Sequence, residues 1–531
     1  MCGIIGGAGP GIVELVLGRL SEMQYRGYDS WGIATVKNGV LVTEKYIGAI
    51  SKTSKDHGEM CIGHTRWATH GMVSLNNTHP ITCENIAVVH NGIIENHGEL
   101  KALCPDFTWT SDTDTELIIA LVRQMLPAGD ASAKNQEVPH LTIDTLEEVL
   151  MKIKGDSAFL MLDTLQEKIF FGRKGATPLF LVLGDTLYLT SDISSVSGHV
   201  ITIKDGQCGS LDAHRFELDN FDIVEVNNSQ AAPSKTHETW FETEFRAQPA
   251  LIEEALTEGV SLPSLENIYL TGCGSAYIAC MVGQYFLNKA GIAAFAYHPS
   301  QLPDFATTIV AVSQSGETAD VLRAMQGRKT IGILNNTHSS IAQRSYWVIP
   351  IHAGKEISVA STKSTACQML VFARWALLAG LQSDLVEIPR AMRRVDLAKI
   401  DLVADSLAEY KHILVIGNGS LYPIALECAL KVKELAYIHA EGMQASELKH
   451  GPLALVQSKV AVLCLGDCGS APMEVQARGG LTFSFDMPEY NEVVAPFVYL
   501  AAVQWLAYRL CKLKGNNVDM PRNLAKSVTV S

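Results

Sequence analysis

The sequence predicts a strand-rich α+β domain followed by two α/β domains with parallel sheets. Three observations lead to this fold class. Up to about residue 215, short apolar runs alternate with Gly, Asn and Asp turn signals, which indicates many short strands. From about residue 258 the rhythm becomes apolar strand, Gly-rich turn and long helix, which is typical of parallel sheets. Within this second part, one strand–turn–helix pattern occurs twice.

The composition limits the class of protein. The chain has 531 residues, of which 47% are hydrophobic and 18% charged, as is usual for a folded globular protein. A net charge of −14 argues against non-specific nucleic-acid binding, which needs a cationic surface. No apolar run approaches the ~18–20 residues of a membrane span, and the N-terminus has no pattern of a secretory signal. The twelve cysteines form no C-x-x-C pair, so we expect no metal site, no disulfide framework and a reducing, cytoplasmic location.

In the first domain we expect strands at residues 33–36, 86–89 and 158–162, and helices at 13–23 and 115–125. Two polar segments interrupt or end this pattern. Residues 127–140 are turn-rich, which indicates a surface excursion, and residues 227–239 read NNSQAAPSKTHET, which indicates a linker.

The repeated pattern lies in the second part of the chain. Residues 268–277 read IYLTGCGSAY, and residues 413–422 read ILVIGNGSLY. Each copy has four apolar residues and then G-x-G-S-x-Y before a helix. A solenoid repeat has a period of about 20–50 residues. These copies lie a domain length apart, so we expect two homologous α/β domains, with the turn of each at the end of a strand.

Cys2 is a candidate nucleophile. Removal of Met1 would expose it as the first residue, where its thiol could attack while its own α-amine, with a pKa of ~7.7–8.0, takes the proton. The alternative is that Cys2 is the first buried residue of a strand at 2–6.

Other polar residues of the first domain suit an amino-acid substrate with an amide side chain. The motifs are YRGYDS at 25–30, HTRWATHG at 64–71, HNGIIENH at 90–97 and SDTDTE at 111–116. The Arg66 guanidinium fits a carboxylate, and Asp114 offers a counter-charge for an ammonium group. Asn91 and the backbone of Gly92 offer donors for an oxyanion hole. For His64, His79 and His90 we keep the interpretation of packing or loop hydrogen bonding.

A candidate phosphate loop follows the first repeat. Residues 309–318 read IVAVSQSGET, an apolar strand that enters a loop of hydroxyls, an amide and Gly before a helix. Ser hydroxyls and backbone N–H groups at such a place hold phosphate; the alternative is an ordinary helix N-cap. The strand at 460–464 is followed by LGDCGSA, without the hydroxyls, so we expect only the first repeat to bind a phosphate.

Further polar stretches belong to the second part: VASTK at 359–363, KVKE at 431–434, ELKHGP at 447–452 and DMPRNLAKSVTV at 519–530. A terminal lysine is usually solvated on a frayed end. The regular apolar spacing of Leu524, Val528 and Val530 around Lys526 indicates instead that this tail docks.

Taken together and in this order, the motifs are specific enough to indicate a protein family. The first domain resembles the N-terminal-nucleophile glutaminase domain of class II glutamine amidotransferases. The whole chain resembles the glutamine–fructose-6-phosphate aminotransferase family, in which that domain precedes two sugar isomerase (SIS) domains. The resemblance implies a glutaminase domain at 2–215, a linker and connecting helix at 216–257, SIS domains at 258–386 and 404–522, and a tail at 523–531 that contributes to the sugar site.

The resemblance also implies residue roles. Cys2 would form the glutamyl thioester, Glu434 would move a proton between C1 and C2 of the sugar, His450 would help to open the ring, and Lys526 would form a Schiff base with the ketose. The other implied residues bind ligands or gate ammonia: for glutamine, Arg66, Thr69, His70, Asn91, Gly92 and Asp114; for the sugar phosphate, Ser275, Ser313, Gln314, Ser315, Thr318, Val359, Ser361 and Lys431, which also supports Glu434; and for the ammonia gate, Trp67.

The implied activity is transfer of ammonia from glutamine to fructose 6-phosphate and isomerisation to glucosamine 6-phosphate. It needs no metal or organic cofactor. We expect a cytoplasmic homodimer that shares site residues between subunits and has no nucleic-acid or membrane partner. Because an amine must be partly neutral to attack, we expect Lys526 to be shielded with a lowered pKa.

This chain departs from the family pattern in places. Ala276 stands where the family usually has Ser, and both SIS domains look shortened. Two alternatives therefore stay open: an aminotransferase that acts on another sugar phosphate, and a non-catalytic SIS-type sugar-phosphate sensor.

Overall fold

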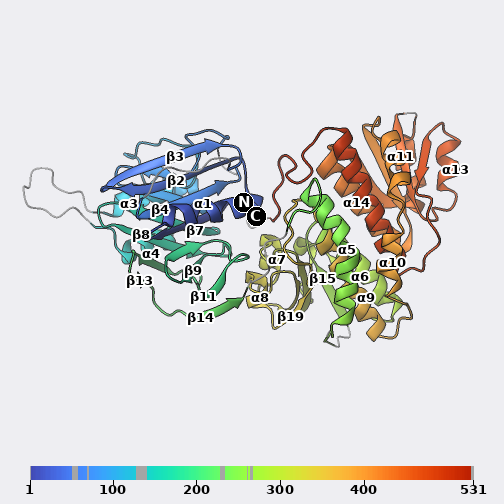
Figure 1. Cartoon of the computed structure of the whole chain (residues 1–531), viewed down its shortest axis with the longest axis horizontal. Coiled ribbons are helices and arrows are strands. Elements are labelled where there is room, and N and C mark those ends of the chain that lie inside the picture. Colours follow the sequence, from blue (N-terminus) through green and yellow to red (C-terminus); the bar gives the residue numbers. More distant parts are fainter. Residues whose placement is uncertain are drawn as a thin grey trace, which may run out of the picture. The chain divides into compact units, whose positions relative to one another are not determined.

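The computed structural model describes residues 2–50, 58–68, 71–126, 140–227, 234–259, 261–263, 267–457 and 459–527. The chain divides into two compact units, the first formed by Met1–Ala231 with Ser527–Ser531 and the second by Ala232–Lys526 (Figure 1). Thr69, His70, Val528 and Val530 lie outside the described residues, as does nearly all of the polar stretch 127–140. No described helix combines the length and the hydropathy that crossing a bilayer requires.

The first unit contains two antiparallel sheets. The larger has the strand order β14-β11-β9-β10-β1-β4-β2-β3. Its strands are β1 (Gly3–Ala8), β2 (Ser30–Lys37), β3 (Val40–Ile47), β4 (Met60–Arg66), β9 (Phe180–Leu183), β10 (Leu187–Thr190), β11 (Ser197–Thr202) and β14 (Ile223–Asn227). The smaller sheet has the order β13-β12-β8-β7-β6-β5. Its strands are β5 (Ile81–Cys83), β6 (Ile86–Gly92), β7 (Ser157–Asp163), β8 (Lys168–Lys174), β12 (Cys208–Leu211) and β13 (Phe216–Glu217).

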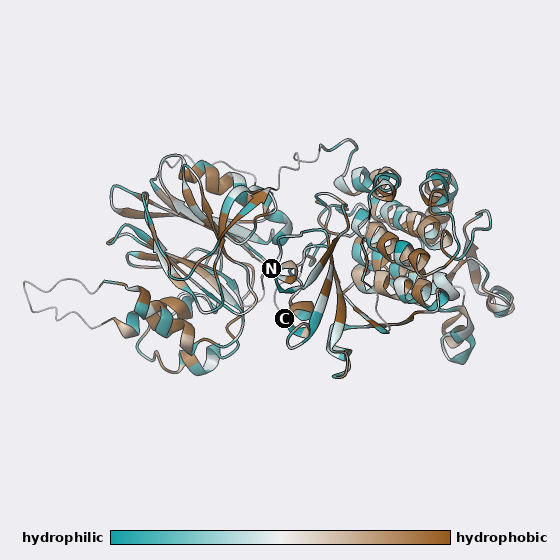
Figure 2. Ribbon diagram, turned by 90° about the horizontal axis from the view of Figure 1, so that it is seen from below, coloured by the Kyte–Doolittle hydropathy of each residue, from teal (hydrophilic) through white to brown (hydrophobic). Residues whose placement is uncertain are grey.

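The two sheets pack face to face between outer helices. Ile4 and Ile62 of the larger sheet share one buried core with Val89 and Leu160 of the smaller, and Figure 2 shows the hydrophobic segments of these strands in brown. Helix α1 (Ile12–Glu22) covers the outer face of the larger sheet. Helices α3 (Glu116–Met125) and α4 (Ile143–Lys152) cover that of the smaller. The remaining helical segments are η1 (Gln24–Arg26) and α2 (His97–Lys101). The expected helices at 13–23 and 115–125 are therefore present, and the α+β class is confirmed.

The sheets of the first unit continue beyond residue 215, where we expected the domain to end. Strand β14 pairs with β11 as far as Asn227, and β13 pairs with β12. The linker prediction for 227–239 thus begins where β14 ends, and α5 starts at Trp240.

The second unit begins with a parallel five-stranded sheet of order β16-β15-β17-β18-β19. Its strands are β15 (Asn267–Thr271), β16 (Ala293–Tyr297), β17 (Thr308–Ser313), β18 (Lys329–Leu334) and β19 (Trp347–Pro350). Around it lie α5 (Trp240–Thr257), α6 (Ser275–Lys289), η2 (Pro299–Gln301), α7 (Ala319–Ala324), α8 (Ser340–Arg344), α9 (Lys363–Leu378) and α10 (Glu387–Arg393).

A parallel four-stranded sheet of order β21-β20-β22-β23 follows. Its strands are β20 (His412–Gly417), β21 (His439–Gln444), β22 (Val460–Leu465) and β23 (Leu481–Ser484). The helical segments are α11 (Leu397–Leu407), η3 (Gly419–Leu421), α12 (Tyr422–Lys431), the π-helical η4 (Val432–Ala436), η5 (Ala445–His450), η6 (Pro452–Leu455), α13 (Ala471–Gln476) and α14 (Ala495–Leu513). The two parallel sheets with their helices confirm the two expected α/β parts. Both sheets contribute to one continuous hydrophobic core.

The repeated motif forms the same local structure twice. In each copy a central strand, β15 or β20, enters the G-x-G turn and then a helix. A Cβ at Gly272 would lie 3.0 Å from the Val312 carbonyl oxygen, and a Cβ at Gly417 would lie 2.7 Å from the Leu421 carbonyl oxygen. The first glycine of each copy is therefore required by close backbone packing at the turn.

Candidate active site

Cys2 lies at the start of β1, beside the end of β4. It is half-buried. The Trp67 backbone N–H donates to Cys2 Sγ at 3.5 Å, and Sγ lies 3.7 Å from the Trp67 carbonyl oxygen. Burial raises the pKa of the Cys2 thiol, while the Trp67 hydrogen bond and the Arg66 charge act in the opposite direction. A base is therefore needed to generate the thiolate that attacks.

Asn91 provides an unsatisfied buried amide at the end of β6. Its side chain is fully buried, and neither its oxygen nor its nitrogen has a hydrogen-bond partner among the described residues. Such groups are uncommon in folded proteins, and the part of Asn91 in glutamine binding stays a prediction. Gly92 has a φ of 146°, and a Cβ there would lie 2.1 Å from the Asp156 carbonyl oxygen, so only glycine fits.

Arg66 and Asp114 are charged groups held inside the first unit. Arg66 ends β4 and is 2% exposed, and its guanidinium donates to the carbonyl oxygens of Gly71 at 3.0 Å and Met72 at 3.3 Å. Asp114 is also buried, and its Oδ2 accepts the Ile94 backbone N–H at 2.9 Å. Burial lowers the pKa of Arg66, whereas Cys2, Asp29 and Asp114 raise it. Both candidates for binding the α-amino acid groups are thus ordered near the thiol.

Sequence reasoning did not single out Asp29. Its Oδ2 accepts the Ala68 backbone N–H at 2.9 Å, so it fixes the chain that follows Trp67. The Trp67 ring packs edge-on against Tyr28, with centroids 6.3 Å apart. The sequence did contain a signal that could have identified these two residues, because Tyr28 and Asp29 both belong to the YRGYDS motif.

Three buried histidines connect the elements of this unit. His64 Nε2 lies 3.0 Å from the His90 carbonyl oxygen, and His79 Nδ1 lies 3.0 Å from His64 Nε2. His90 contacts the hydroxyls of Thr115 and Ser157 at 3.1 and 2.9 Å. Burial lowers the pKa of His64 and His79 well below the usual value, so both are neutral. Their hydrogen bonds fit the interpretation of packing.

In the second unit, the loop after β17 gathers its hydroxyl groups. Ser313 Oγ lies 2.9 Å from Thr318 Oγ1 and accepts the Gly316 backbone N–H at 3.0 Å, while Ser315 Oγ accepts a backbone N–H at 3.2 Å. A Cβ at Gly316 would lie 1.9 Å from the Ser339 hydroxyl oxygen, and its φ is 69°. Gln314 is half-buried in the same loop. The four predicted phosphate-loop residues are thus brought together.

A charged cluster joins α12 to the first repeat's turn. Lys431 Nζ lies 2.7 Å from Glu434 Oε2 and 3.3 Å from Glu427 Oε1. It also donates to Ser275 Oγ at 3.0 Å, and Ser275 Oγ in turn donates to Glu427 Oε1 at 2.9 Å. Burial raises the pKa of Glu427. Burial alone would lower the pKa of Lys431, but Glu427 and Glu434 raise it, so Lys431 is charged. Lys431 therefore fixes the position of the Glu434 carboxylate.

The Ser275 hydroxyl is already engaged in this cluster. A serine has one O–H hydrogen, and here Glu427 accepts it. In this arrangement the side chain has no hydrogen left for a phosphate oxygen, and Ala276 supplies none. Phosphate binding by the Ser275 hydroxyl stays a prediction; the contact that the structure gives is the link between the turn and α12.

Lys526 is buried in an ion pair with Glu356. Glu356 Oε1 also accepts the N–H and hydroxyl of Thr362 and the N–H of Ser364, each at 3.1 Å, and Oε2 accepts the Ser364 hydroxyl at 2.7 Å. Burial raises the pKa of Glu356, but Lys526 and Ser364 outweigh it and lower this pKa to about 2. Lys526 is thus shielded from water, as expected, and a carboxylate balances its charge.

The segment with Val359 and Ser361 is tied to the C-terminal segment. The Val359 backbone N–H donates to the Asp519 carbonyl oxygen at 3.0 Å. The Asp519 carboxylate accepts the backbone N–H groups of Trp240 and Phe241 at 2.9 and 2.8 Å, at the N-terminus of α5. Ser361 Oγ lies 2.7 Å from the Ser364 hydroxyl, which bonds Glu356. Lys526, Val359 and Ser361 therefore lie in one hydrogen-bonded region.

His450 is not part of these clusters. It ends η5 and is exposed, and within the described ranges it has no hydrogen bond or ion pair with another candidate site residue. No group of three or more described His, Cys, Asp or Glu side chains is arranged to hold a metal ion.

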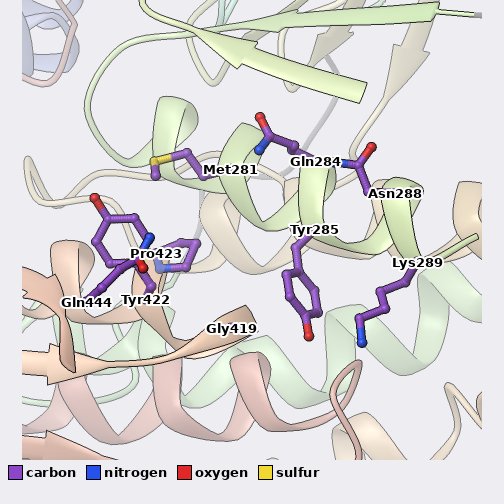
Figure 3. A pocket seen from close by; sticks show the side chains of 9 residues that line it. All are labelled: Met281, Gln284, Tyr285, Asn288, Lys289, Gly419, Tyr422, Pro423 and Gln444. Carbon is purple, nitrogen blue, oxygen red and sulfur yellow. The ribbon is translucent and has the colours of Figure 1, made fainter. Parts of the chain in front are cut away.

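A pocket lies at the second repeat's turn. Its volume is about 460 Å³. Figure 3 shows that α6 supplies one wall, with Met281, Gln284, Tyr285, Asn288 and Lys289, and that Gly419, Tyr422, Pro423 and Gln444 supply the other. The two turns are 145 residues apart in the chain. Applied to the helices that follow them, this offset matches Lys289, at the end of α6, to Glu434, which follows α12. Lys289 is paired with Glu492 at 2.8 Å. Val282 and Phe286, which the same offset places at the positions of Glu427 and Lys431, are buried in the core and do not line the pocket, so the pocket is not a counterpart of the Lys431 cluster.

Glu427 and Glu356 were also missed from the sequence. Glu427 had a signal, because it precedes Lys431 by four residues and so lies on the same helix face. Glu356 had no such signal, because it lies in the irregular segment between β19 and α9 and only the folded chain brings it to Lys526.

Comparison with known proteins decides the family. A model of the SIS domain matches residues 262–378 and 406–472, and a model of the glutamine amidotransferase domain matches residues 64–197. The glutamine–fructose-6-phosphate aminotransferases (isomerizing) of Pyrococcus horikoshii and Bradyrhizobium diazoefficiens are 34% and 33% identical to this chain, and each alignment covers all of both proteins. The chain belongs to the glutamine–fructose-6-phosphate aminotransferase family.

One solved structure agrees with this family assignment, and a second shows the same fold. The C-terminal domain of a glucosamine-fructose-6-phosphate aminotransferase from Francisella tularensis is 27% identical, covers 55% of this chain and all of its own, and has a TM-score of 0.50. A glucosamine-6-phosphate deaminase from Thermotoga maritima, 23% identical with a TM-score of 0.50, covers 55% of this chain and all of its own, and shares the fold. The alignments to the two family members span 608 and 619 positions. With 531 residues, this chain is shorter than either alignment, so gaps stand opposite parts of its relatives.

Proposed function

We propose that this protein transfers ammonia from glutamine to fructose 6-phosphate and isomerises the product to glucosamine 6-phosphate. The observation that carries the proposal is the buried Lys526–Glu356 pair beside Val359 and Ser361. A sugar-phosphate sensor has no need of a buried amine at its sugar site, whereas a ketose transferase uses one to form an imine. The full-length family relatives bear the name of this activity.

The glutaminase step follows from the Cys2 region. Once Met1 is removed, the α-amine of Cys2 takes the thiol proton, and Sγ attacks the glutamine amide carbon. Asn91 and the Gly92 backbone N–H stabilise the oxyanion, which fits the unpartnered amide of Asn91. Arg66 and Asp114 hold the carboxylate and ammonium groups, and Thr69 and His70 are also assigned to glutamine binding. Ammonia leaves, and water hydrolyses the thioester to glutamate.

The sugar step follows from the clusters of the second unit. Ser313, Gln314, Ser315 and Thr318 bind the phosphate, and Val359 and Ser361 line the sugar. Lys526 gives up a proton and attacks C2 of the open ketose, and water leaves to form the imine, which ammonia then displaces. Glu434, held by Lys431, takes a proton from C1 while the imine nitrogen gains one, and C2 is then protonated while the C1 hydroxyl loses its proton. The result is an aldose with an amino group at C2.

Three further assignments complete the proposal. Ammonia would be protonated in bulk water and lose its nucleophilicity, so it needs a shielded route, and Trp67 next to Cys2 is the proposed gate. His450 opens the sugar ring; because it is exposed and apart from the other site residues, we assign it to the site of a second subunit in a homodimer. We place the enzyme in the cytoplasm, without a metal or organic cofactor.

The test is mass spectrometry of the product formed from glutamine and fructose 6-phosphate. Cys2→Ala should abolish glutamine hydrolysis and glutamine-driven synthesis while sugar isomerisation continues, because the isomerase residues lie in the other unit. Lys526→Arg should lose synthesis but keep Cys2-dependent hydrolysis, and borohydride should trap sugar on Lys526 of the wild type only. An aminosugar made from another ketose phosphate, but not from fructose 6-phosphate, would identify a different acceptor. No product from any ketose, with no glutaminase activity, would identify a sensor.

A further inference from the structure

A second buried carboxyl group lies beside the Lys526–Glu356 pair. Glu244 is on α5 and only 3% exposed. Its Oε1 accepts the backbone N–H groups of Ile357 and Ser358, the latter at 3.3 Å. Its Oε2 is buried and has no hydrogen-bond partner in the described part of the chain. None of the steps proposed above uses this group.

The partners of the two carboxyl groups differ in kind. Glu356 accepts four hydrogen bonds from Thr362 and Ser364 and pairs with the Lys526 ammonium, so its negative charge is well balanced. Among the described residues, Glu244 has only two backbone donors, both on one oxygen. Two adjacent buried carboxylates cannot both be ionised without a large cost. The proton therefore belongs on the group with fewer donors, which is Glu244.

We propose that Glu244 is a positioning residue that stays protonated in the active enzyme and so leaves Glu356 as the single carboxylate that pairs with Lys526. This inference rests on the proposed function of Lys526. The charged groups that face Glu244 are Glu356, Lys526 and Lys363. Lys363 donates to the Lys355 carbonyl oxygen at 2.8 Å.

The electrostatics agree with the geometry. Burial and the neighbouring Glu356 raise the pKa of Glu244 to about 8, although Lys526, the Ile357 N–H and Lys363 act against them. Below that pH the carboxylic acid is neutral. Above it, a second carboxylate faces Lys526 and stabilises its ammonium form. The amine must lose that proton before it attacks C2, so ionisation of Glu244 slows imine formation.

The hydrogen bonds of Glu244 also connect it to the sugar segment. Ile357 and Ser358 lie between Glu356 and Val359, so one carboxylic acid on α5 holds the backbone from which the sugar-site residues project. A glutamine at this position keeps an oxygen acceptor for both N–H groups and cannot ionise. Glu244→Gln therefore separates the charge of the group from its structural role.

The first experiment measures borohydride trapping of fructose 6-phosphate on Lys526 between about pH 6 and 10 in the full-length protein. Below about pH 8 the wild type and Glu244→Gln should trap at similar rates, whereas above it the wild type should be slower than the variant, because only its Glu244 ionises and stabilises the ammonium form of Lys526. Glu254→Gln, an exposed carboxylate on the same helix, is the control and should follow the wild type. Glutamine hydrolysis without sugar should be the same in all three, because Cys2 lies in the other unit.

Each outcome has a consequence. Trapping that is absent at every pH would overturn the proposed function of Lys526 and this inference with it. Trapping that occurs with the same pH dependence in wild type and Glu244→Gln overturns the role of Glu244 alone. Loss of trapping at all pH values in Glu244→Gln, with glutaminase intact, would mean that an ionised Glu244 is needed, which also overturns it. A wild-type rate that rises as a single ionisation through pH 10, with no change of slope near pH 8, overturns it even if the variant fails to fold.

A second measurement does not depend on activity. Because the pKa of Glu244 is raised on folding, the folded protein keeps a proton that the unfolded chain releases between about pH 4.5 and 8, so this group makes stability fall as pH rises through that range. Urea unfolding of Glu244→Gln should lack this contribution. Its stability relative to wild type should rise from about pH 5 to 8 and then level off. A difference that stays constant with pH would show that Glu244 is ionised throughout.

Discussion

The two copies of the G-x-G-S-x-Y turn share a backbone but not a chemistry. At the first copy, the Ser275 hydroxyl meets Glu427 and Lys431 of α12, and Lys431 holds Glu434. At the second copy, the facing helix α6 has Val282, Phe286 and Lys289 at the positions that the 145-residue offset gives to Glu427, Lys431 and Glu434. Val282 and Phe286 are fully buried, as Glu427 is, and Lys431 is 1% exposed.

The difference shows where function resides in a repeated fold. At both copies the two helix positions are buried, and at the first copy the described contacts join them to the turn serine. Apolar residues fill such positions at low cost, whereas a buried lysine between two glutamates needs every partner in position. Clusters of this kind are more typical of functional sites than of packing. The motif therefore predicts the backbone architecture at both turns. The chemistry at each turn is decided by the facing helix, through the residues seven to fourteen positions after that helix's own motif serine.

The loops after the neighbouring strands differ in the same way. After β17, three hydroxyl side chains gather around backbone N–H groups. After β22, the exposed Asp467 accepts the Gly469 N–H at 2.8 Å. A carboxylate repels a phosphate, so the second loop is unsuited to the ligand that the first is proposed to bind.

The largest expected effect is on the proton transfer assigned to the first copy. Glu434→Gln should lower the rate of aminosugar phosphate formation by about 10²–10⁴-fold, the usual contribution of a general base. Borohydride trapping on Lys526 and glutamine hydrolysis should persist. Lys289→Gln, at the matching position of the second copy, should leave the rate unchanged. Equal losses in both variants would show that the two regions do not differ in function.

The second effect is on stability. Lys431→Met should destabilise the protein by about 3–5 kcal/mol, because it leaves the buried Glu427 without its cation. Phe286→Met, the matched change at the second copy, should cost less than about 1.5 kcal/mol. Urea unfolding measures both. Similar costs would contradict the view that the first copy is held by paired charges.

Exchanging the residues sharpens this test. The double variant Glu427→Val with Lys431→Phe gives α12 the two buried residues that α6 has. It should recover most of the stability that Lys431→Met loses, since apolar residues replace buried ion pairs at little cost. Its synthase activity should stay absent. Recovery of activity would show that the buried charges are dispensable for catalysis.

The third effect concerns the phosphate loops. Ser315→Ala should weaken the affinity for fructose 6-phosphate by about 1–3 kcal/mol, the cost of removing one hydrogen bond to a charged group. Ser470→Ala in the loop after β22 should leave that affinity unchanged. Titration with the sugar phosphate, with glutamine hydrolysis in its absence as the control, measures both. An unchanged affinity in Ser315→Ala would place the phosphate elsewhere.

Much of this could be predicted from the sequence, because local signals carry it. The apolar pattern predicted the strand-rich first domain and the parallel sheets of the second part. The repeated turn predicted that the second part contains two α/β domains. The loop at Ser313–Thr318 and the Lys431–Glu434 pair were visible because their members are close in the chain.

What could not be predicted depends on contacts between distant segments. Glu356 and Glu244 reach Lys526 only through the tertiary fold, and no spacing in the sequence announces them. The bonds of the Ser275 hydroxyl to Glu427 and Lys431, more than 150 residues away, were likewise not visible in the sequence, while its assignment to the phosphate stays a prediction. A motif indicates the backbone geometry of its residues, and the fold decides which distant side chains they meet.

The smallest expected effect compares the two serines of the repeated turn. Ser275→Ala removes a donor to Glu427 and an acceptor for Lys431, so it should cost about 1–3 kcal/mol in stability. Ser420→Ala should change stability by about 0.5 kcal/mol or less, because its side chain faces no charged group in any contact that the structure describes. The two variants also separate two roles of Ser275. If its hydroxyl binds phosphate, Ser275→Ala should weaken fructose 6-phosphate binding as much as Ser315→Ala does. If it serves only the Lys431 cluster, affinity should hold while the isomerisation rate falls, because Lys431 no longer fixes Glu434 as firmly.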